Sequence, residues 1–134
     1  MREKNFLTIA FTLPYFFEGE EIAITEILER ATADILHLRK PDSTFFQMKS
    51  LLEKIPRHLH SKIKIHDHFS LIEEFRLGGV HLNARNPIAP QNVNSLSCSM
   101  HTIEQLEAAK HYDYVTLSPI YDSISKPGYR AIFR

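Results

Sequence analysis

The chain has almost no cysteine, no long hydrophobic run and no net charge. Its 134 residues contain one cysteine, Cys98, which excludes an internal disulfide framework and suits a reducing compartment, so we expect a cytoplasmic protein. No apolar stretch approaches the roughly 20 residues of a membrane span, and no small-residue cleavage site follows the short apolar run Phe6–Phe11. The 16 basic and 16 acidic residues cancel, which argues against electrostatic binding to nucleic acid or to a membrane surface.

Strand-like and helix-like segments alternate along the chain. The predicted strands are Phe6–Thr12, Ile35–Lys40, Lys62–His66, Gly79–Asn83, Leu96–His101 and Tyr112–Ser118. The predicted helices are Glu20–Arg30, the stretch from the N-cap Ser43 to Ile55, the segment Ser70–Leu77 ended by Gly78 and Gly79, and a segment opened by the capping box Thr102–Gln105. Repeated strand and helix units predict one α/β domain over residues 1–134 with a parallel sheet.

Side chains within the predicted strands alternate between apolar and polar. One parity is apolar or soft: Leu7, Ile9, Phe11, Leu36, Leu38, Ile63, Ile65, Val80, Leu82, Cys98, Met100, Val115 and Leu117. The other parity is mainly polar: Thr8, Ala10, Thr12, His37, Arg39, Lys64, His66, His81, Asn83, Ser97, Ser99, His101, Tyr114, Thr116 and Ser118. Because successive strand residues face opposite sides, each strand has one apolar and one polar face.

This alternation favours a barrel. A doubly wound sheet, covered by helices on both faces, would have nearly continuous hydrophobic strands. An antiparallel sheet with a solvated face conflicts with the intervening helices. We therefore predict a TIM-type (β/α)8 barrel, with one strand face toward the helices and the other toward a small lumen, and with its active site at the carboxyl ends of the strands. The sequence contains about six β/α units, so we expect strands 7 and 8 to be missing from this chain.

Several residues near strand ends could carry chemistry. Asp67 directly follows a predicted strand, where a carboxylate suits Mg²⁺, although a helix N-cap or a solvated turn is the alternative. The pairs His58/His60 and His66/His68 allow a zinc site, but no cysteine completes a tetrahedral set nearby, and solvated or hydrogen-bonded histidines are favoured.

Basic residues suggest an anionic ligand. Arg39 and Lys40 close the second predicted strand, where a guanidinium can grip a phosphate bidentately and an ammonium adds charge. Lys126 lies in a loop that also offers the hydroxyls of Ser123 and Ser125. Solvated basic side chains are the competing interpretation for both groups.

The fifth predicted strand offers a hydroxyl and an imidazole on its polar face. His101 could transfer protons near neutral pH, with Ser99 beside it on the same face. No acidic residue adjoins His101 in the sequence, so the sequence does not support a Ser-His-Asp hydrolase triad. Cys98 has the opposite parity, which favours a buried thiol over a nucleophile.

Six segments, in register, make the chain similar to the family of thiamine phosphate synthase and its relative thiazole tautomerase. They are Leu36-His37-Leu38-Arg39-Lys40, Ile65-His66-Asp67, Gly79-Val80-His81-Leu82, Ser99-Met100-His101-Thr102, Tyr112-Asp113-Tyr114-Val115 with Ser118-Pro119-Ile120-Tyr121, and Ser123-Ile124-Ser125-Lys126. The resemblance implies a barrel. It also implies a transferase of thiamine biosynthesis that joins a pyrimidine diphosphate to a thiazole phosphate and releases pyrophosphate with the help of Mg²⁺.

The resemblance also implies roles for individual residues. Asp67 and Asn86 would be the metal positions, although Asn86 brings no charge where the family has a carboxylate. The catalytic residues would be Arg39, Ser99, His101 and Lys126. Substrate binding would involve His37, Arg39, Lys40, His66, His81, Ser99, Ser123, Ser125 and Lys126. His66 stands where the family has asparagine, and Lys40-Pro41 replaces an acidic and a basic residue after the family arginine.

Two alternatives remain open beside the synthase. The chain could be a thiazole tautomerase that uses His101 as acid and base without Mg²⁺. It could also be a non-catalytic truncated barrel that binds a diphosphate or a partner chain through unpaired strand edges. The expected partners are the small-molecule substrates, with a homo-oligomer possible and with no nucleic acid and no membrane.

Overall fold

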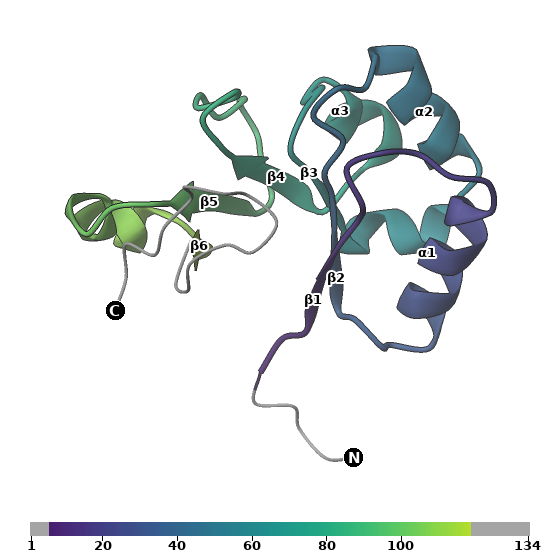
Figure 1. Ribbon diagram of the computed structural model, residues 1–134, viewed down its shortest axis with the longest axis horizontal. Coiled ribbons are helices and arrows are strands. Elements are labelled where there is room, and N and C mark those ends of the chain that lie inside the picture. The colour runs from purple at the N-terminus through teal and green to yellow at the C-terminus, as the bar shows by residue number, and fades with distance from the viewer. Residues whose placement is uncertain (1–5, 119–134) are drawn as a thin grey trace, which may run out of the picture.

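A computed structural model describes residues 6–118, in which six strands alternate with helical segments (Figure 1). The strands are β1 (Ile9–Phe11), β2 (Ile35–Leu38), β3 (Ile63–Ile65), β4 (Gly79–Leu82), β5 (Leu96–Met100) and β6 (Tyr114–Leu117). The helical segments are α1 (Glu20–Glu29), α2 (Phe45–Glu53), α3 (Leu71–Phe75) and the 3₁₀ segments η1 (Arg57–Lys62) and η2 (Glu104–His111). All six predicted strands are present, each shorter than its predicted range.

The strands form one sheet in the order of the sequence. Its order is β1-β2-β3-β4-β5-β6, and every neighbouring pair is parallel. A doubly wound sheet reverses its strand order at a switch point, and this sheet does not. The sheet is curled, with α1, α2 and α3 gathered on one side of it (Figure 1). The parallel α/β arrangement of a partial barrel is thus confirmed. Among residues 6–118, every helix is too short or too polar to cross a membrane.

The core lies between the sheet and the three α-helices. Leu38, Ile65 and Val80, on three neighbouring strands, are fully buried in one cluster with Leu28 of α1 and Leu52 of α2. Burying one such side chain stabilises a fold by roughly 1.5–3 kcal/mol. This apolar face therefore holds the strands against the helices and leaves the other face to form the lumen.

The predicted faces of β1 are reversed in the structure. Phe11 pairs in register with His37, and its ring lies 4.6 Å from the imidazole of His37 between centroids, on the lumen side. Ala10, which we predicted on the polar face, instead packs against the apolar core. The register with β2, which the sequence of β1 alone does not determine, decides this orientation.

The helix boundaries differ from prediction in their caps. Thr44, rather than Ser43, caps α2: its hydroxyl accepts the Gln47 amide at 3.1 Å, and the Gln47 side chain accepts the Thr44 amide at 2.9 Å. The Ser43 hydroxyl donates instead to the Lys40 carbonyl at 2.7 Å. Helix α3 ends at Arg76, which adopts a left-handed φ of 52°, before Gly78 is reached.

The predicted capping box at Thr102 forms, but it does not open an α-helix. The Gln105 amide donates to the Thr102 hydroxyl at 3.3 Å, and the Gln105 side chain accepts the Thr102 amide at 3.1 Å. The segment that follows is the 3₁₀ segment η2, which has no buried residue. Without an apolar face to bury, this segment lacks the packing that gives most protein helices their stability.

Candidate functional site

The lumen face of the sheet carries a network of buried polar side chains. His37, Lys64, His81 and Ser97 are each at most 2% exposed. The Ser97 hydroxyl oxygen accepts a hydrogen bond from the Lys64 ammonium at 3.0 Å, and the same oxygen lies 2.7 Å from Nδ1 of His81. On the other side of the same ring, Nε2 of His81 lies 2.7 Å from the Ser99 hydroxyl. The predicted polar lumen is therefore present, and its groups are bonded to one another.

Three histidines meet at the centre of this network. His37 of β2, His66 directly after β3 and His81 of β4 each offer a ring nitrogen, and these nitrogens lie within 4.8 Å of one another. Nδ1 of His37 is 2.8 Å from Nε2 of His66, and Nε2 of His37 is 2.6 Å from the Tyr114 hydroxyl. The rings of His66 and His81 are stacked, with centroids 4.4 Å apart.

Burial keeps these imidazoles neutral. It lowers the pKa of His37 to about 3, of His66 to about 2 and of His81 to about 4, and the charge of Lys64 adds to the effect on His37 and His81. Burial also lowers the pKa of Lys64 to about 8. At neutral pH the three rings can therefore act as hydrogen-bonding groups or as metal ligands, but they carry no positive charge.

A cavity of about 500 Å³ opens at the carboxyl ends of the strands. Its wall includes four predicted site residues, Arg39, His66, Ser99 and His101. Arg39 is fixed through its backbone, since its amide donates to the Thr12 hydroxyl at 3.0 Å and its carbonyl accepts that hydroxyl at 3.1 Å. The structure thus brings a guanidinium, a hydroxyl and two imidazoles around one space, in the region where barrels of this type hold their active sites.

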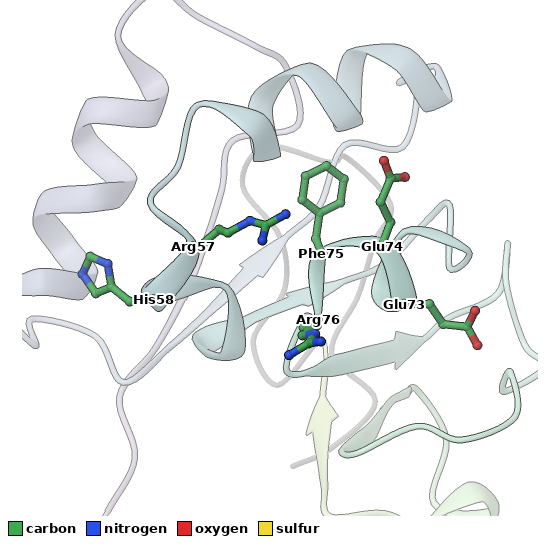
Figure 2. Close-up of a pocket in the computed structure, with 6 residues that line it drawn as sticks. All are labelled: Arg57, His58, Glu73, Glu74, Phe75 and Arg76. Atoms are coloured by element: carbon green, nitrogen blue, oxygen red, sulfur yellow. The ribbon is translucent and has the colours of Figure 1, made fainter.

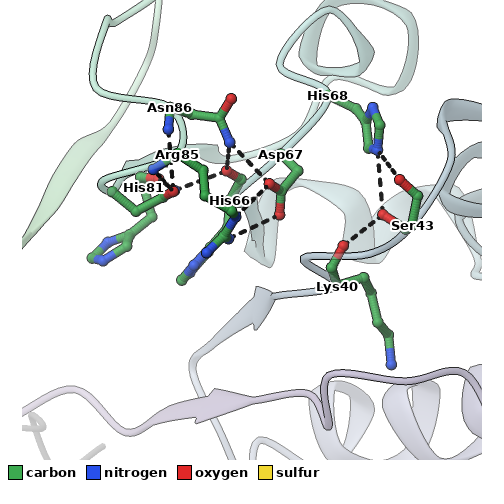
Figure 3. A network of polar contacts seen from close by, with 9 residues as sticks. Lys40, Ser43, His66, Asp67, His68, His81, Arg85 and Asn86 are labelled. Carbon is green, nitrogen blue, oxygen red and sulfur yellow. Dashed lines mark hydrogen bonds and ion pairs between the residues drawn. The ribbon is translucent and has the colours of Figure 1, made fainter.

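Asp67 lies beside this cavity and binds Arg85. Its two carboxylate oxygens accept from Nε and Nη2 of Arg85 at 3.2 and 3.3 Å (Figure 3). The side-chain nitrogen of Asn86 donates to Asp67 at 2.9 Å and to the backbone carbonyl of His66 at 2.9 Å. Both contacts of that nitrogen are acceptors, so Asn86 presents its amide hydrogens to Asp67. The two predicted metal positions are adjacent, but the oxygen of Asn86 is not the atom that faces Asp67.

The donor set around Asp67 can be compared with the needs of Mg²⁺. This ion is commonly held by one or two carboxylates together with substrate phosphates and water. Asp67 supplies one carboxylate, and its partner Arg85 is 37% exposed and lines the cavity, so the guanidinium can leave Asp67 for an incoming diphosphate. The site therefore fits a Mg²⁺ ion whose remaining ligands come from a diphosphate, with Asn86 orienting Asp67.

Lys40, predicted to bind substrate, is placed elsewhere. Its side chain points away from Asp67 (Figure 3) and is fully buried. The ammonium donates to the Leu13 carbonyl at 2.8 Å, the Tyr15 carbonyl at 2.6 Å and the Glu20 carboxylate at 2.5 Å. These contacts join the end of β2 to the segment before α1.

The other histidines proposed for zinc have protein partners. Nε2 of His60 contacts the carbonyls of Leu52 and Ile55, and His58 pairs with Glu29. Nε2 of His68 lies 2.9 Å from the Ser43 carbonyl. His58 and His60 thus have hydrogen-bond partners, as expected for solvated or hydrogen-bonded histidines.

A second cavity, of about 540 Å³, lies at the opposite ends of the strands. It is lined by η1 residues Arg57 and His58 and by the end of α3, which leads into β4 (Figure 2). Glu73, Glu74 and Arg76 give it charges of both signs. It contains none of the residues that we assigned to the reaction.

Sequence reasoning missed two contributors to the site and named three that lie outside the described residues. Arg85 was not singled out, although it stands next to Asn86 in the loop after β4, and Phe11 was placed on the wrong face. Ser123, Ser125 and Lys126 lie beyond residue 118.

Comparisons with known proteins identify relatives. Residues 14–132 match the protein family described as thiamine monophosphate synthase. A crystal structure of thiamine phosphate pyrophosphorylase from Bacteroides thetaiotaomicron is 46% identical, with a TM-score of 0.79 over 86% of this chain and 59% of that chain. Thiamine phosphate pyrophosphorylase from Pyrococcus furiosus is 18% identical and shares the fold, with a TM-score of 0.67 over 93% of this chain and 63% of that chain. Comparison with curated proteins gives no match. The chain thus spans about three fifths of the length of these two structures.

Proposed function

The chain belongs to the thiamine monophosphate synthase family, and on this basis we propose that it couples a hydroxymethylpyrimidine diphosphate with a thiazole phosphate. The observation that carries the proposal is the cavity that joins Arg39, Arg85 and Ser99 at the carboxyl ends of the strands, with His66 also in its wall and Asp67 bound to Arg85. The products would be thiamine phosphate and pyrophosphate. The single cysteine supports a cytoplasmic location for this reaction.

The charges around the cavity suit a diphosphate leaving group. The bond between the pyrimidine methylene carbon and the diphosphate oxygen breaks, and both electrons leave with the oxygen. Arg39 and Arg85 can donate charge-assisted hydrogen bonds to that oxyanion, and Ser99 can add a hydroxyl donor. The thiazole nitrogen then forms the new bond to the methylene carbon. Asp67 would hold Mg²⁺, which supplies further positive charge to the departing diphosphate.

Thiamine phosphate formation by the full chain tests this proposal. We expect product only with Mg²⁺ present, and we expect Arg39→Gln to lower turnover about 100-fold or more, as loss of one transition-state donor does. Asp67→Ala should abolish the response to Mg²⁺. Asp42→Ala is the matched control, because Asp42 is exposed and outside the cavity. Equal turnover with and without Mg²⁺ would contradict the metal role, and pyrophosphate binding without turnover would indicate a non-catalytic module.

One contact favours the tautomerase as a second candidate. Nδ1 of His101 lies 2.7 Å from the Ser118 carbonyl, which can only accept, so Nδ1 carries the hydrogen and Nε2 carries the lone pair. A neutral imidazole held in this tautomer can act as a general base. Isomerisation of a thiazole carboxylate phosphate without Mg²⁺, lost in His101→Gln, would support this activity. Isomerisation that persists in the variant would exclude His101 as the base.

A further inference from the structure

The proposed reaction assigns no chemical step to the cluster of His37, His66 and His81, although His66 lines the cavity of that reaction. The three residues come from neighbouring strands, and each is at most 2% exposed. Each buried ring must find partners for two nitrogens, and here the rings of His37 and His66 meet each other directly, with 2.8 Å between their nitrogens. The cluster therefore calls for an explanation beyond packing.

The geometry of the cluster is close to that of a three-histidine metal site. Zinc–nitrogen bonds are about 2.0–2.1 Å long, so two ligands of a tetrahedral zinc ion lie roughly 3.3 Å apart. The facing nitrogens of His37 and His66 are 2.8 Å apart, and the whole set lies within 4.8 Å. Shifts of an ångström or so, by small rotations of the rings, would bring the nitrogens to ligand distances.

Outer partners for two of the rings are already in place. Metal-bound histidines almost always place their second ring nitrogen on a carboxylate, carbonyl or other polar group, which orients the ring. Nε2 of His37 contacts the Tyr114 hydroxyl, and Nδ1 of His81 contacts the Ser97 hydroxyl. The second nitrogen of His37 faces His66 inside the cluster, whereas Nε2 of His81 lies 2.7 Å from the Ser99 hydroxyl and would exchange that contact for the ion.

We propose that His37, His66 and His81 bind a zinc ion, with the remaining coordination position directed toward the cavity that His66 lines. Three imidazole nitrogens suit zinc and other first-row transition metals, whereas Mg²⁺ prefers oxygen ligands. This site is therefore distinct from the Mg²⁺ position at Asp67. With three protein ligands and one open position, its composition is that of a catalytic rather than a closed structural zinc site.

One feature of the lumen opposes the ion. The Lys64 ammonium donates to Ser97, which also contacts His81, and it lies 4.2 Å from the centroid of the Tyr114 ring. A positive charge at this position repels a metal cation. The same residue provides a diagnostic substitution, because Lys64→Met removes the charge and keeps most of the apolar stem.

Zinc titration of the full chain, after EDTA treatment and dialysis, tests the proposal by calorimetry. We expect one high-affinity ion per chain. His81→Gln should weaken binding by more than 100-fold, Tyr114→Phe by about 10-fold or more through the loss of an outer partner, and Lys64→Met should strengthen it. His58→Gln is the matched control, since His58 is exposed and pairs with Glu29 outside the lumen. Asp67→Asn should leave zinc binding unchanged, which separates this site from the proposed reaction.

Cobalt provides a measurement that does not depend on folding of the variants. We expect Co²⁺ added to the unmodified chain to show the visible absorption bands of a four-coordinate ion, and zinc to remove them. Failure of the unmodified chain to bind either ion, or binding that is equal in His81→Gln and His58→Gln when both are folded by circular dichroism, would overturn the proposal.

Discussion

Replacing Lys40 should destabilise the fold without acting through the substrate cavity. The ammonium is buried, donates to two carbonyls and to Glu20, and lies 4.9 Å from the centroid of the Phe16 ring. Among the described residues, Oε1 of Glu20 has no hydrogen-bond partner, so Lys40 is the principal compensation for this buried carboxylate. Lys40→Met would leave a buried charge unpaired and two carbonyls unsatisfied.

The size of the loss follows from that burial. Removing one member of a buried ion pair costs about 3–5 kcal/mol. At a typical urea dependence of about 2 kcal/mol per molar, the midpoint of unfolding should fall by about 2 M. Urea denaturation followed by circular dichroism measures this shift.

Two further variants make the test specific. Lys49→Met is the matched control: Lys49 and Glu74 form an ion pair at 2.9 Å with side chains 34% and 44% exposed, and its loss should shift the urea midpoint far less than the loss of Lys40, because solvent screens the pair. Combining Lys40→Met with Glu20→Gln should restore part of the stability, because neither buried charge then remains. If Lys40→Met costs no more than Lys49→Met and abolishes product formation, the structural role is refuted and substrate binding is supported.

Three other predictions concern local features. Thr44→Ala should lower the unfolding free energy by about 1 kcal/mol in urea, because it removes the N-cap of α2, whereas Ser50→Ala on the exposed side of that helix should not. Gly79→Ala should lower the thermal midpoint of unfolding more than Gly19→Ala does. A Cβ at Gly79 would clash with the Ser95 carbonyl oxygen, 2.0 Å away, whereas a Cβ at Gly19 would meet no atom within 4 Å. The substitution at Gly19 carries only the backbone cost of a φ of 85°. Burial raises the pKa of Cys98, so the folded chain at pH 8 should react with iodoacetamide more slowly than the urea-unfolded chain; equal rates would show that the thiol is not shielded.

The parallel α/β barrel arrangement and the polar lumen were predictable because both follow from the local pattern of strands, helices and alternating side chains. Alternation within each strand identified Ser97, Ser99 and Tyr114 as one face, and the structure places all three on the lumen. The same reasoning failed at β1, where the aromatic Phe11 was assigned to the core. Its neighbour Ala10 is small enough to face the helices, and only the pairing of β1 with β2 fixes which of the two does so.

The role of Lys40 could not be read from its position at a strand end. A basic residue there is equally suited to a phosphate in solvent and to a carboxylate under a loop. The segment 13–20 passes over this strand end and supplies two carbonyls and Glu20, so the ammonium is enclosed. This enclosure depends on how the segment 13–20 folds over the end of β2, and the spacing of apolar residues in the sequence does not predict the path of that segment.

The histidine cluster could be predicted only in part, unlike the polar lumen, which was predicted, and the role of Lys40, which was not. Each of its members was predicted to face the lumen, and the structure makes β2, β3 and β4 neighbours in the sheet. In the observed register His37 pairs with Lys64, one residue before Ile65, whereas His66 lies beyond the end of β3. Because parallel strands are staggered in a curled sheet, His66 and His81 can stack and still reach His37 across the lumen. The sequence therefore indicates which side chains share the lumen, while the stagger of the strands decides which of them can share one ion.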